Sequence, residues 1–326
     1  MSHELTTNSR GQVEFAYLTS DGQAWHGLGQ GLPDHAPHDA WIQAAGMDWK
    51  ILRSKVRYAV ARPDTSGVLE PAQFMELPEK HVLFRSDDKA PLGVCSDRYK
   101  VVQPREVLEF FKDIVKVGGL QLSAAGTVFG GKRFWATAKI GEACPTSVKD
   151  KIGGYLLLST SADGSLATEV RLTSIRVVCR NTLAMAMADK SQVKVSHRST
   201  FRPDEVKAFM GLNETAWAAF KHSITRLANK PVGKEQAEEL TFSLLGGQDK
   251  VRGSAAYNKI LDLFAGEGQG STLDGVYGTA WGWVNSVSEH ADHWARARSD
   301  ANRFVSSQWG AGAAMKNDAL KLALSL

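Results

Sequence analysis

Four short segments in the middle of the chain decide the fold: QLSAAGTVFG (121–130), KRFWATAKI (132–140), GGYLLLSTSA (153–162) and SLATEVRLT (165–173). Each mixes β-branched and aromatic residues and ends near glycine or a polar turn residue, which predicts strands. Asp163-Gly164 lies between the last two segments and favours the positive backbone angles of a two-residue turn. These two segments should therefore form a hairpin.

The flanking sequence adds one long strand, helices and a change of character near residue 200. WKILRSKVRYAVAR alternates as a strand from about 48 to 61 does, and apolar residues at helical spacing predict a helix over 103–117. A short helix fits 39–45, and after residue 203 most segments are helical. We expect an α+β protein with a mostly antiparallel sheet domain at 1–200 and a helical domain at 201–326.

Composition places the chain among soluble globular proteins, with 326 residues, 43% apolar and 23% charged. No apolar run is long enough for a membrane span, and the first residues lack the apolar core of a signal peptide. We therefore expect a cytoplasmic protein without membrane partners. Cys95, Cys144 and Cys179 are odd in number and widely spaced, which favours buried reduced thiols over disulfides or a thiolate zinc site.

The positive charge is concentrated in one segment, Val170 to Pro203. It holds seven Lys or Arg against the single acid Asp189, an excess of six, whereas the whole chain has a net charge of +4. The other 292 residues therefore carry about minus two. A localised basic stripe interleaved with Ser, Thr and Asn suits a polyanion, and nucleic acid is the obvious candidate.

Two elements should present these cations. Apolar residues from Ile175 onward recur at helical steps after a Ser or Thr cap, so a helix would place Arg176 and Arg180 on one face. The alternating segment 191–200 predicts a strand. The candidate nucleic-acid-binding residues are Arg171, Arg176, Arg180, Asn181, Lys194, Arg198 and Arg202. The alternative is an internal ion-pair set in which the cations meet Glu169, Asp189, Asp204 and Glu205.

A second group of polar residues follows Trp281. Asn285, Glu289 and His293 recur at four-residue steps with Asp292 nearby, a spacing that serves a metal or a proton relay. A buried hydrogen-bond network joining this helix to the N-terminal domain explains the same residues, and we favour it. The loop AGEGQGSTLDG (265–275) lacks the lysine of a phosphate-binding loop. We thus expect no metal, no cofactor and no catalytic residue.

Two further features bear on binding and assembly. Tyr155, Phe201, Phe134 and Trp135 lie near the stripe and could stack on unpaired bases, although their alternation within strands favours core packing. Short strands over 120–173 leave a sheet edge that must be paired, covered or blunted. A homo-oligomer is one solution.

The chain resembles an uncharacterised family of phage- and plasmid-borne proteins. RVVCRNTLAMA (176–186), YGTAWGWVNSVSEHADHWARAR (277–298) and WGAGAAMKNDALKLAL (309–324) carry the resemblance. It implies a mobile-element setting and no particular chemistry. The order hairpin, hairpin, helix over 121–188 is also similar to phage single-strand annealing proteins, which assemble into rings or filaments. That second likeness concerns the fold alone.

These observations favour a protein that binds single-stranded nucleic acid, chiefly DNA, and promotes strand annealing in recombination. Two alternatives remain open. One is a mobile-element protein that binds and regulates or inhibits a host protein. The other is a metal-dependent nucleic-acid hydrolase that uses Glu289, Asp292 and His293.

Overall fold

The computed structural model describes residues 5–8, 10–21, 28–61, 73–117, 120–143, 152–176, 182–184, 192–195, 217–271 and 273–326. The fold is α+β, as predicted. The strands are β1 (Phe15–Leu18), β2 (Gln30–Leu32), β3 (Ile51–Val60), β4 (Gln73–Arg85), β5 (Pro91–Ser96), β6 (Gln121–Val128), β7 (Arg133–Ala143), β8 (Ile152–Ser161), β9 (Thr168–Arg176), β10 (Thr182–Ala184) and β11 (Gln192–Val195). The helices are α1 (His38–Ala44), α2 (Pro104–Val117), a helix over 217–228, α4 (Lys234–Leu244), α5 (Ala255–Asp262), α6 (Ala280–Glu289), α7 (Asp300–Trp309) and α8 (Ala311–Leu324).

The large sheet is mostly antiparallel. Its strand order is β10-β9-β8-β7-β6-β1-β2, and β11 pairs with β9 as well. β1 and β2 run parallel, and the other pairs in this sheet are antiparallel. β8 lies between β7 and β9 and is buried along nearly its whole length, which explains its run of three leucines, Leu156 to Leu158.

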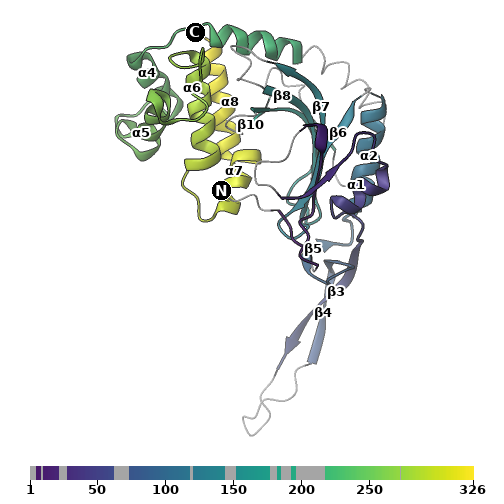
Figure 1. The fold of residues 1–326 in the computed structure, drawn as a ribbon. Coiled ribbons are helices and arrows are strands. Elements are labelled where there is room, and N and C mark those ends of the chain that lie inside the picture. The colour runs from purple at the N-terminus through teal and green to yellow at the C-terminus, as the bar shows by residue number, and fades with distance from the viewer. Residues whose placement is uncertain are drawn as a thin grey trace.

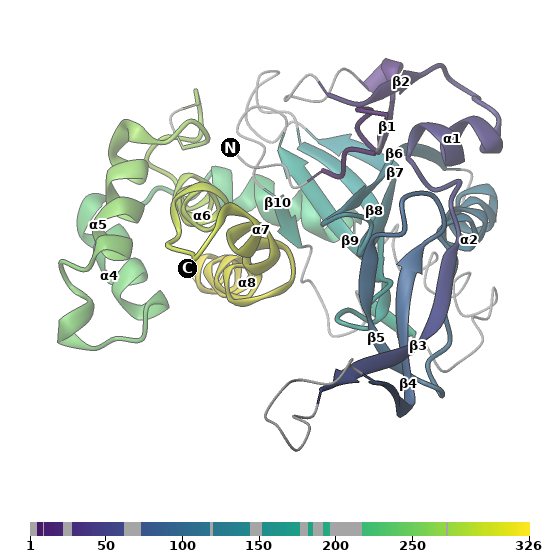
Figure 2. The same ribbon diagram turned by 90° about the horizontal axis from the view of Figure 1, so that it is seen from below.

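Helices cover both faces of this sheet. Figures 1 and 2 show α1 and α2 on one side and α7 and α8 on the other. The first face is apolar, because alternate side chains such as Leu158 and Val170 sit opposite each other and are buried. α6 is buried over its whole length and forms the centre of the helical part. Among the described residues, no helix is long and apolar enough to cross a membrane.

A smaller sheet, ordered β3-β4-β5, extends from the body and ends in a projecting hairpin of β3 and β4 (Figure 1). A buried ion pair fastens its base to the large sheet. Arg85, at the end of β4, donates to both carboxylate oxygens of Glu14 at 2.5 and 3.1 Å, and both side chains are 1% exposed. The guanidinium also lies 4.2 Å from the centre of the Trp49 ring. Gly131 is required beside it, because a Cβ there would meet Arg85 and Trp49 at 2.7 Å.

Most of the predicted local elements are confirmed. The strand over 48–61 is β3, the helix over 103–117 is α2, and the short helix is α1. β8 and β9 form the predicted hairpin, but the two-residue turn is wrong, since the strands end at Ser161 and resume at Thr168. Polar side chains close the wider loop: Ser161 Oγ bonds both backbone groups of Leu166, and Asp163 accepts from the Ser165 amide. Cys95 is a free, buried thiol as expected, whereas Cys144 and Cys179 lie outside the described residues.

Candidate nucleic-acid interface

The helix predicted from Ile175 is wrong in the part that the structure describes. β9 continues to Arg176, which pairs with Ile152 of β8, and residues 182–184 form β10. The apolar spacing from Ile175 onward fits a helix, but β8 offers a long row of backbone partners. Ladder hydrogen bonds with a buried neighbour therefore decide the conformation. The strand predicted within 191–200 is confirmed as β11.

The basic segment returns twice to one strand. β10 pairs with β9 at Thr173 to Ile175, and β11 pairs with it at Thr168 to Arg171. Both pairings are antiparallel and occupy successive stretches of β9, on the side away from β8. The two described returns of the segment therefore lie along the same sheet edge. Arg176 ends β9 and Lys194 lies in β11, while Arg180, Asn181, Arg198 and Arg202 fall outside the described residues.

Arg171 points into the protein rather than to a ligand. Its Nη2 donates to the Gln308 carbonyl oxygen at 2.8 Å, and its Nε lies 3.8 Å from a Glu169 carboxylate oxygen. The guanidinium also faces the Trp309 ring, 6.0 Å from its centre. Its side chain is 13% exposed, and burial lowers the pKa of the guanidinium although Glu169 raises it in part. For this residue the internal ion pair, the alternative that the sequence left open, describes the structure.

A second buried ion pair lies near Arg171. Lys316 of α8 donates to Asp292 at 2.7 Å, and the two side chains are 2% and 6% exposed. Burial lowers the pKa of the Lys316 ammonium, Asp292 opposes that shift, and Arg171 adds to it. Each of the two ion pairs lies within one part of the chain, and the hydrogen bond from Arg171 to the Gln308 carbonyl joins the sheet to the C-terminal helices.

The polar group that follows Trp281 forms hydrogen bonds within the protein. Asn285 donates to the Trp281 carbonyl at 2.7 Å, and Glu289 accepts the backbone amides of Gln269 and Gly270. The carboxylate therefore anchors the glycine-rich loop. Asp292 is held by Lys316. These hydrogen bonds and this ion pair form the favoured polar network, and they connect elements of the helical part with one another. Within the described residues no three His, Cys, Asp or Glu side chains cluster as a metal site requires.

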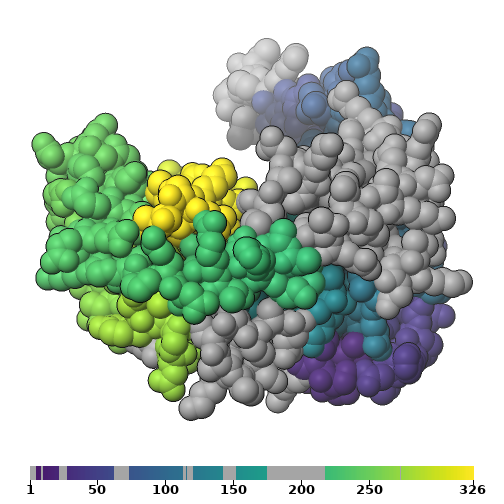
Figure 3. Space-filling model, turned by 90° about the horizontal axis from the view of Figure 1, so that it is seen from above, coloured from purple at the N-terminus to yellow at the C-terminus, as the bar shows by residue number. Residues whose placement is uncertain are grey.

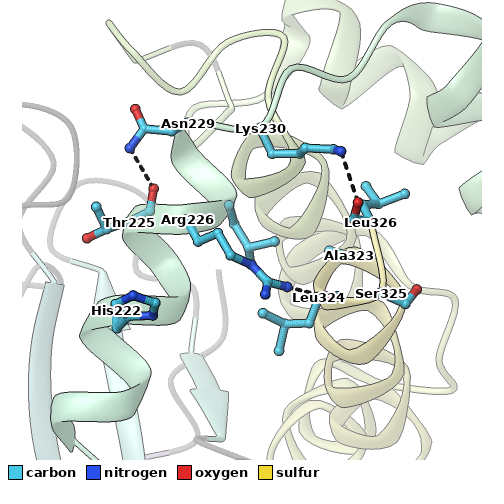
Figure 4. Close-up of a pocket in the computed structure, with 10 residues that line it drawn as sticks. His222, Thr225, Arg226, Asn229, Lys230, Ala323, Leu324, Ser325 and Leu326 are labelled. Carbon is cyan, nitrogen blue, oxygen red and sulfur yellow. Dashed lines mark hydrogen bonds between the residues drawn. The ribbon is translucent and has the colours of Figure 1, made fainter.

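The sequence reasoning missed a cationic helix face. His222, Arg226 and Lys230 follow one another at four-residue steps along the helix over 217–228 and its end, and they line a cleft of about 810 Å³ with the last turn of α8 (Figure 4). Arg226 donates to the Leu324 carbonyl, and Lys230 donates to the Leu326 carbonyl at 2.9 Å. Each cation therefore uses some of its N–H donors to bind carbonyl oxygens at the C-terminal end of α8.

The described part of this helix starts at Trp217, which lies over strands β7 and β8 of the large sheet. Trp217 lies over Gly141 and Gly154, where a Cβ would meet the indole at 2.8 and 2.7 Å. Gly154 pairs with Ser174, which in turn pairs with Leu183 of β10. Figure 3 shows the helix on the molecular surface next to the yellow α8. The four-residue spacing of its cations was visible in the sequence.

The aromatic residues considered for base stacking differ in how deeply they are buried. Phe134 is 1% exposed and packs on Trp49 with ring centres 5.7 Å apart, so it belongs to the core. Trp135 and Tyr155 are half-buried, and the Trp135 ring lies 5.6 Å from that of Phe15. Phe201 is outside the described residues.

Comparison with known proteins gives a family and no function. No curated protein and no solved structure matches the chain. A family model described as Domain of unknown function (DUF932) matches residues 91–309, which is more than half of the chain and includes β5 to β11, α2 and the helices through α7. The chain belongs to this family.

Proposed function

We propose that the protein binds single-stranded nucleic acid along the sheet edge that β10 and β11 form beside β9, where the basic segment lies. One observation carries the proposal: β10 and β11 pair with successive stretches of β9, so both returns of the most basic segment meet one edge. Because Arg171 is internal, the remaining candidates are Arg176, Arg180, Asn181, Lys194, Arg198 and Arg202. Their six-residue set supplies five cations and one amide for phosphate and sugar contacts.

The neighbouring helix supports a path longer than the sheet edge. Lys221, His222 and Arg226 are exposed on the helix over 217–228, and Arg226 and Lys230 keep donors beyond those bound to α8. A flexible single strand follows such a bent track more easily than a stiff duplex does. We propose further that the protein promotes strand annealing and acts on phage or plasmid DNA.

Fluorescence anisotropy with single-stranded and duplex oligonucleotides of equal length, at low and high salt, tests the proposal. We expect tighter binding of the single strand. Arg176→Glu combined with Arg180→Glu should weaken it and flatten the log–log salt dependence by about 1.4, since each lost phosphate contact removes about 0.7 for single strands.

Controls separate the site from general charge effects. Lys132→Glu combined with Lys89→Glu changes the net charge equally at exposed positions away from β9, and it should leave the slope unchanged. Duplex binding as tight as single-strand binding, or an unchanged slope in a folded Arg176/Arg180 variant, would contradict the proposal.

The alternative of a metal-dependent hydrolase receives less support. Two of its three proposed residues are committed to protein partners, Glu289 to backbone amides and Asp292 to Lys316. A nuclease assay with added Mg²⁺ or Mn²⁺ on the same oligonucleotides tests it directly.

A further inference from the structure

Arg133, the first residue of β7, is a half-buried cation without a counter-ion. Its guanidinium forms no hydrogen bond and no ion pair within the described residues, and Nη1 is fully enclosed, whereas Nε and Nη2 are not. Burial lowers the pKa of this guanidinium, although Asp163 and Glu169 raise it in part. Both carboxylates are bound elsewhere, because Asp163 accepts the Ser165 amide and Glu169 accepts the Ser159 hydroxyl.

Aromatic rings hold the Arg133 guanidinium in place. Its central carbon lies 5.6 Å from the centre of the Phe129 ring and 4.9 Å from the centre of the Trp309 ring. Phe304 packs against both rings, with its centre 6.2 Å from that of Phe129 and 5.8 Å from that of Trp309. A guanidinium that lies over aromatic rings keeps its in-plane N–H donors for a ligand and loses little freedom when one binds.

The neighbouring cations already have carboxylate partners. Arg171 faces the same indole ring, and its Nε lies 3.8 Å from a Glu169 oxygen. Lys316 donates to Asp292 at 2.7 Å. These three cations therefore share two carboxylates, and Arg133 is the one without a partner. An unpaired charge in a partly buried position lowers stability, which points to a role in binding.

Arg133 also lies near the sheet edge that we propose for the nucleic acid. Two residues further along β7, Trp135 pairs with Ser159 of β8. Ser159 pairs with Glu169 of β9, which pairs with Lys194 of β11. Neighbouring strands are about 4.8 Å apart, so β7 lies roughly 14 Å from β11. Single-strand sites hold about 4–16 nucleotides, which is enough to reach both strands.

We infer that Arg133 binds a phosphate group of the single strand. Nε and Nη2 share one edge of the guanidinium, and their parallel N–H bonds match two oxygens of a phosphate. The enclosed Nη1 lies away from that edge. The source of the phosphate rests on the proposed function, whereas the lack of a counter-ion at Arg133 does not.

Arg133→Met tests the inference, because methionine fits between the rings without a charge. The variant should melt at the parent's temperature or above it, since no unpaired cation remains. Its affinity for a single-stranded oligonucleotide, measured by fluorescence anisotropy, should fall about tenfold. The log–log salt slope should become shallower by about 0.7, the share of one phosphate contact.

Two variants serve as controls. Lys132→Met removes the same charge from the exposed neighbouring residue, and it should leave the affinity and the salt slope unchanged. Arg133→Lys keeps the charge but loses the planar pair of donors, so it should keep the slope and recover only part of the affinity.

Inorganic phosphate gives a second readout without nucleic acid. Compared with chloride at equal ionic strength, phosphate should raise the melting temperature of the parent and of Lys132→Met more than that of Arg133→Met. This result without oligonucleotide binding would support a phosphate site at Arg133 and contradict the proposed function.

Two outcomes would overturn the inference and leave the proposed function standing. In the first, the parent and Arg133→Met bind the oligonucleotide equally well and respond equally to phosphate. In the second, Arg133→Met melts several degrees lower and binds as the parent does, which would make Arg133 a structural residue.

Discussion

Removing the Asp292 carboxylate should leave Lys316 as an uncompensated buried charge. The two side chains are 6% and 2% exposed, and the Asp292 Oδ1 to Lys316 Nζ distance is 2.7 Å. Loss of one partner of such a pair costs about 3–5 kcal/mol of unfolding free energy. This loss of unfolding free energy has an upper limit, because Lys316 can become neutral by releasing its proton. From an ordinary pKa of 10.5, that release costs about 4.8 kcal/mol at pH 7.

Because the cost of deprotonating Lys316 falls as pH rises, the expected loss of stability depends on pH. The unfolded chain keeps this lysine protonated up to its ordinary pKa, whereas the variant's folded state holds it neutral. The unfolded state then binds more protons, so the stability of Asp292→Asn should rise with pH by up to about 1.4 kcal/mol per unit between pH 7 and 10. Burial already lowers the pKa of Lys316 in the parent protein, and Asp292 limits that shift.

Urea denaturation followed by circular dichroism, on the parent and Asp292→Asn at pH 7 and 9.5, measures both quantities. We expect a loss of roughly 3–5 kcal/mol at pH 7, a fall in Tm of roughly 10 °C, and a smaller loss at pH 9.5. Asp292→Leu combined with Lys316→Met should recover most of the stability, because no charge remains buried. A loss below about 1 kcal/mol, or one independent of pH, would refute the reasoning.

Two further predictions concern the N-terminal half. Glu14→Gln should lower the unfolding free energy by about 3 kcal/mol, because the buried Arg85 guanidinium loses its bidentate partner. Glu76→Gln on the exposed hairpin of β3 and β4 should leave the denaturation midpoint unchanged. Equal midpoints for the two variants would contradict this prediction. Burial raises the pKa of Tyr99 to about 12, so the folded state binds more protons than the unfolded one above pH 10, and stability should fall as pH rises from 10 to 12. Tyr99→Phe should remove that part of the pH dependence, and tyrosinate absorbance of the folded parent at pH 11 equal to that of the unfolded chain would show the assignment to be wrong.

The sequence correctly predicted those elements whose residue pattern fits only one type of secondary structure. α2 has apolar residues only at helical spacing, and the hairpin of β8 and β9 combines two apolar runs with a turn signal, so local chemistry suffices. The stretch after Leu172 has two readings. Its apolar residues fit a helix from Ile175, but β8 supplies partners up to Ile152, and that choice depends on a strand about twenty residues away in sequence.

The candidate site was harder to predict than the fold. A count of charges treats Arg171 as part of a solvent-exposed stripe, yet its guanidinium is held by Glu169 two residues earlier and by Gln308 from α7. That second contact spans 137 residues of sequence and has no local signal. The hairpin of β3 and β4 shows that a correctly predicted element can still occupy an unpredicted position. Alternation in β3 correctly predicts a strand, but a strand pattern does not reveal that the hairpin projects beyond the body.

The internal position of Arg171 also limits how strongly the basic segment can depend on salt. Without it, residues 176–202 hold six cations: Arg176, Arg180, Lys190, Lys194, Arg198 and Arg202. If each contacted one phosphate of a single strand, the log–log slope would be about −4. A steeper measured slope would therefore require cations outside the segment. The described cations Lys221 and Arg226 of the helix over 217–228 are candidates, so Lys221→Glu with Arg226→Glu should then reduce the slope. A slope of −4 or shallower that these changes do not alter would confine the nucleic acid to the sheet edge formed by β10 and β11.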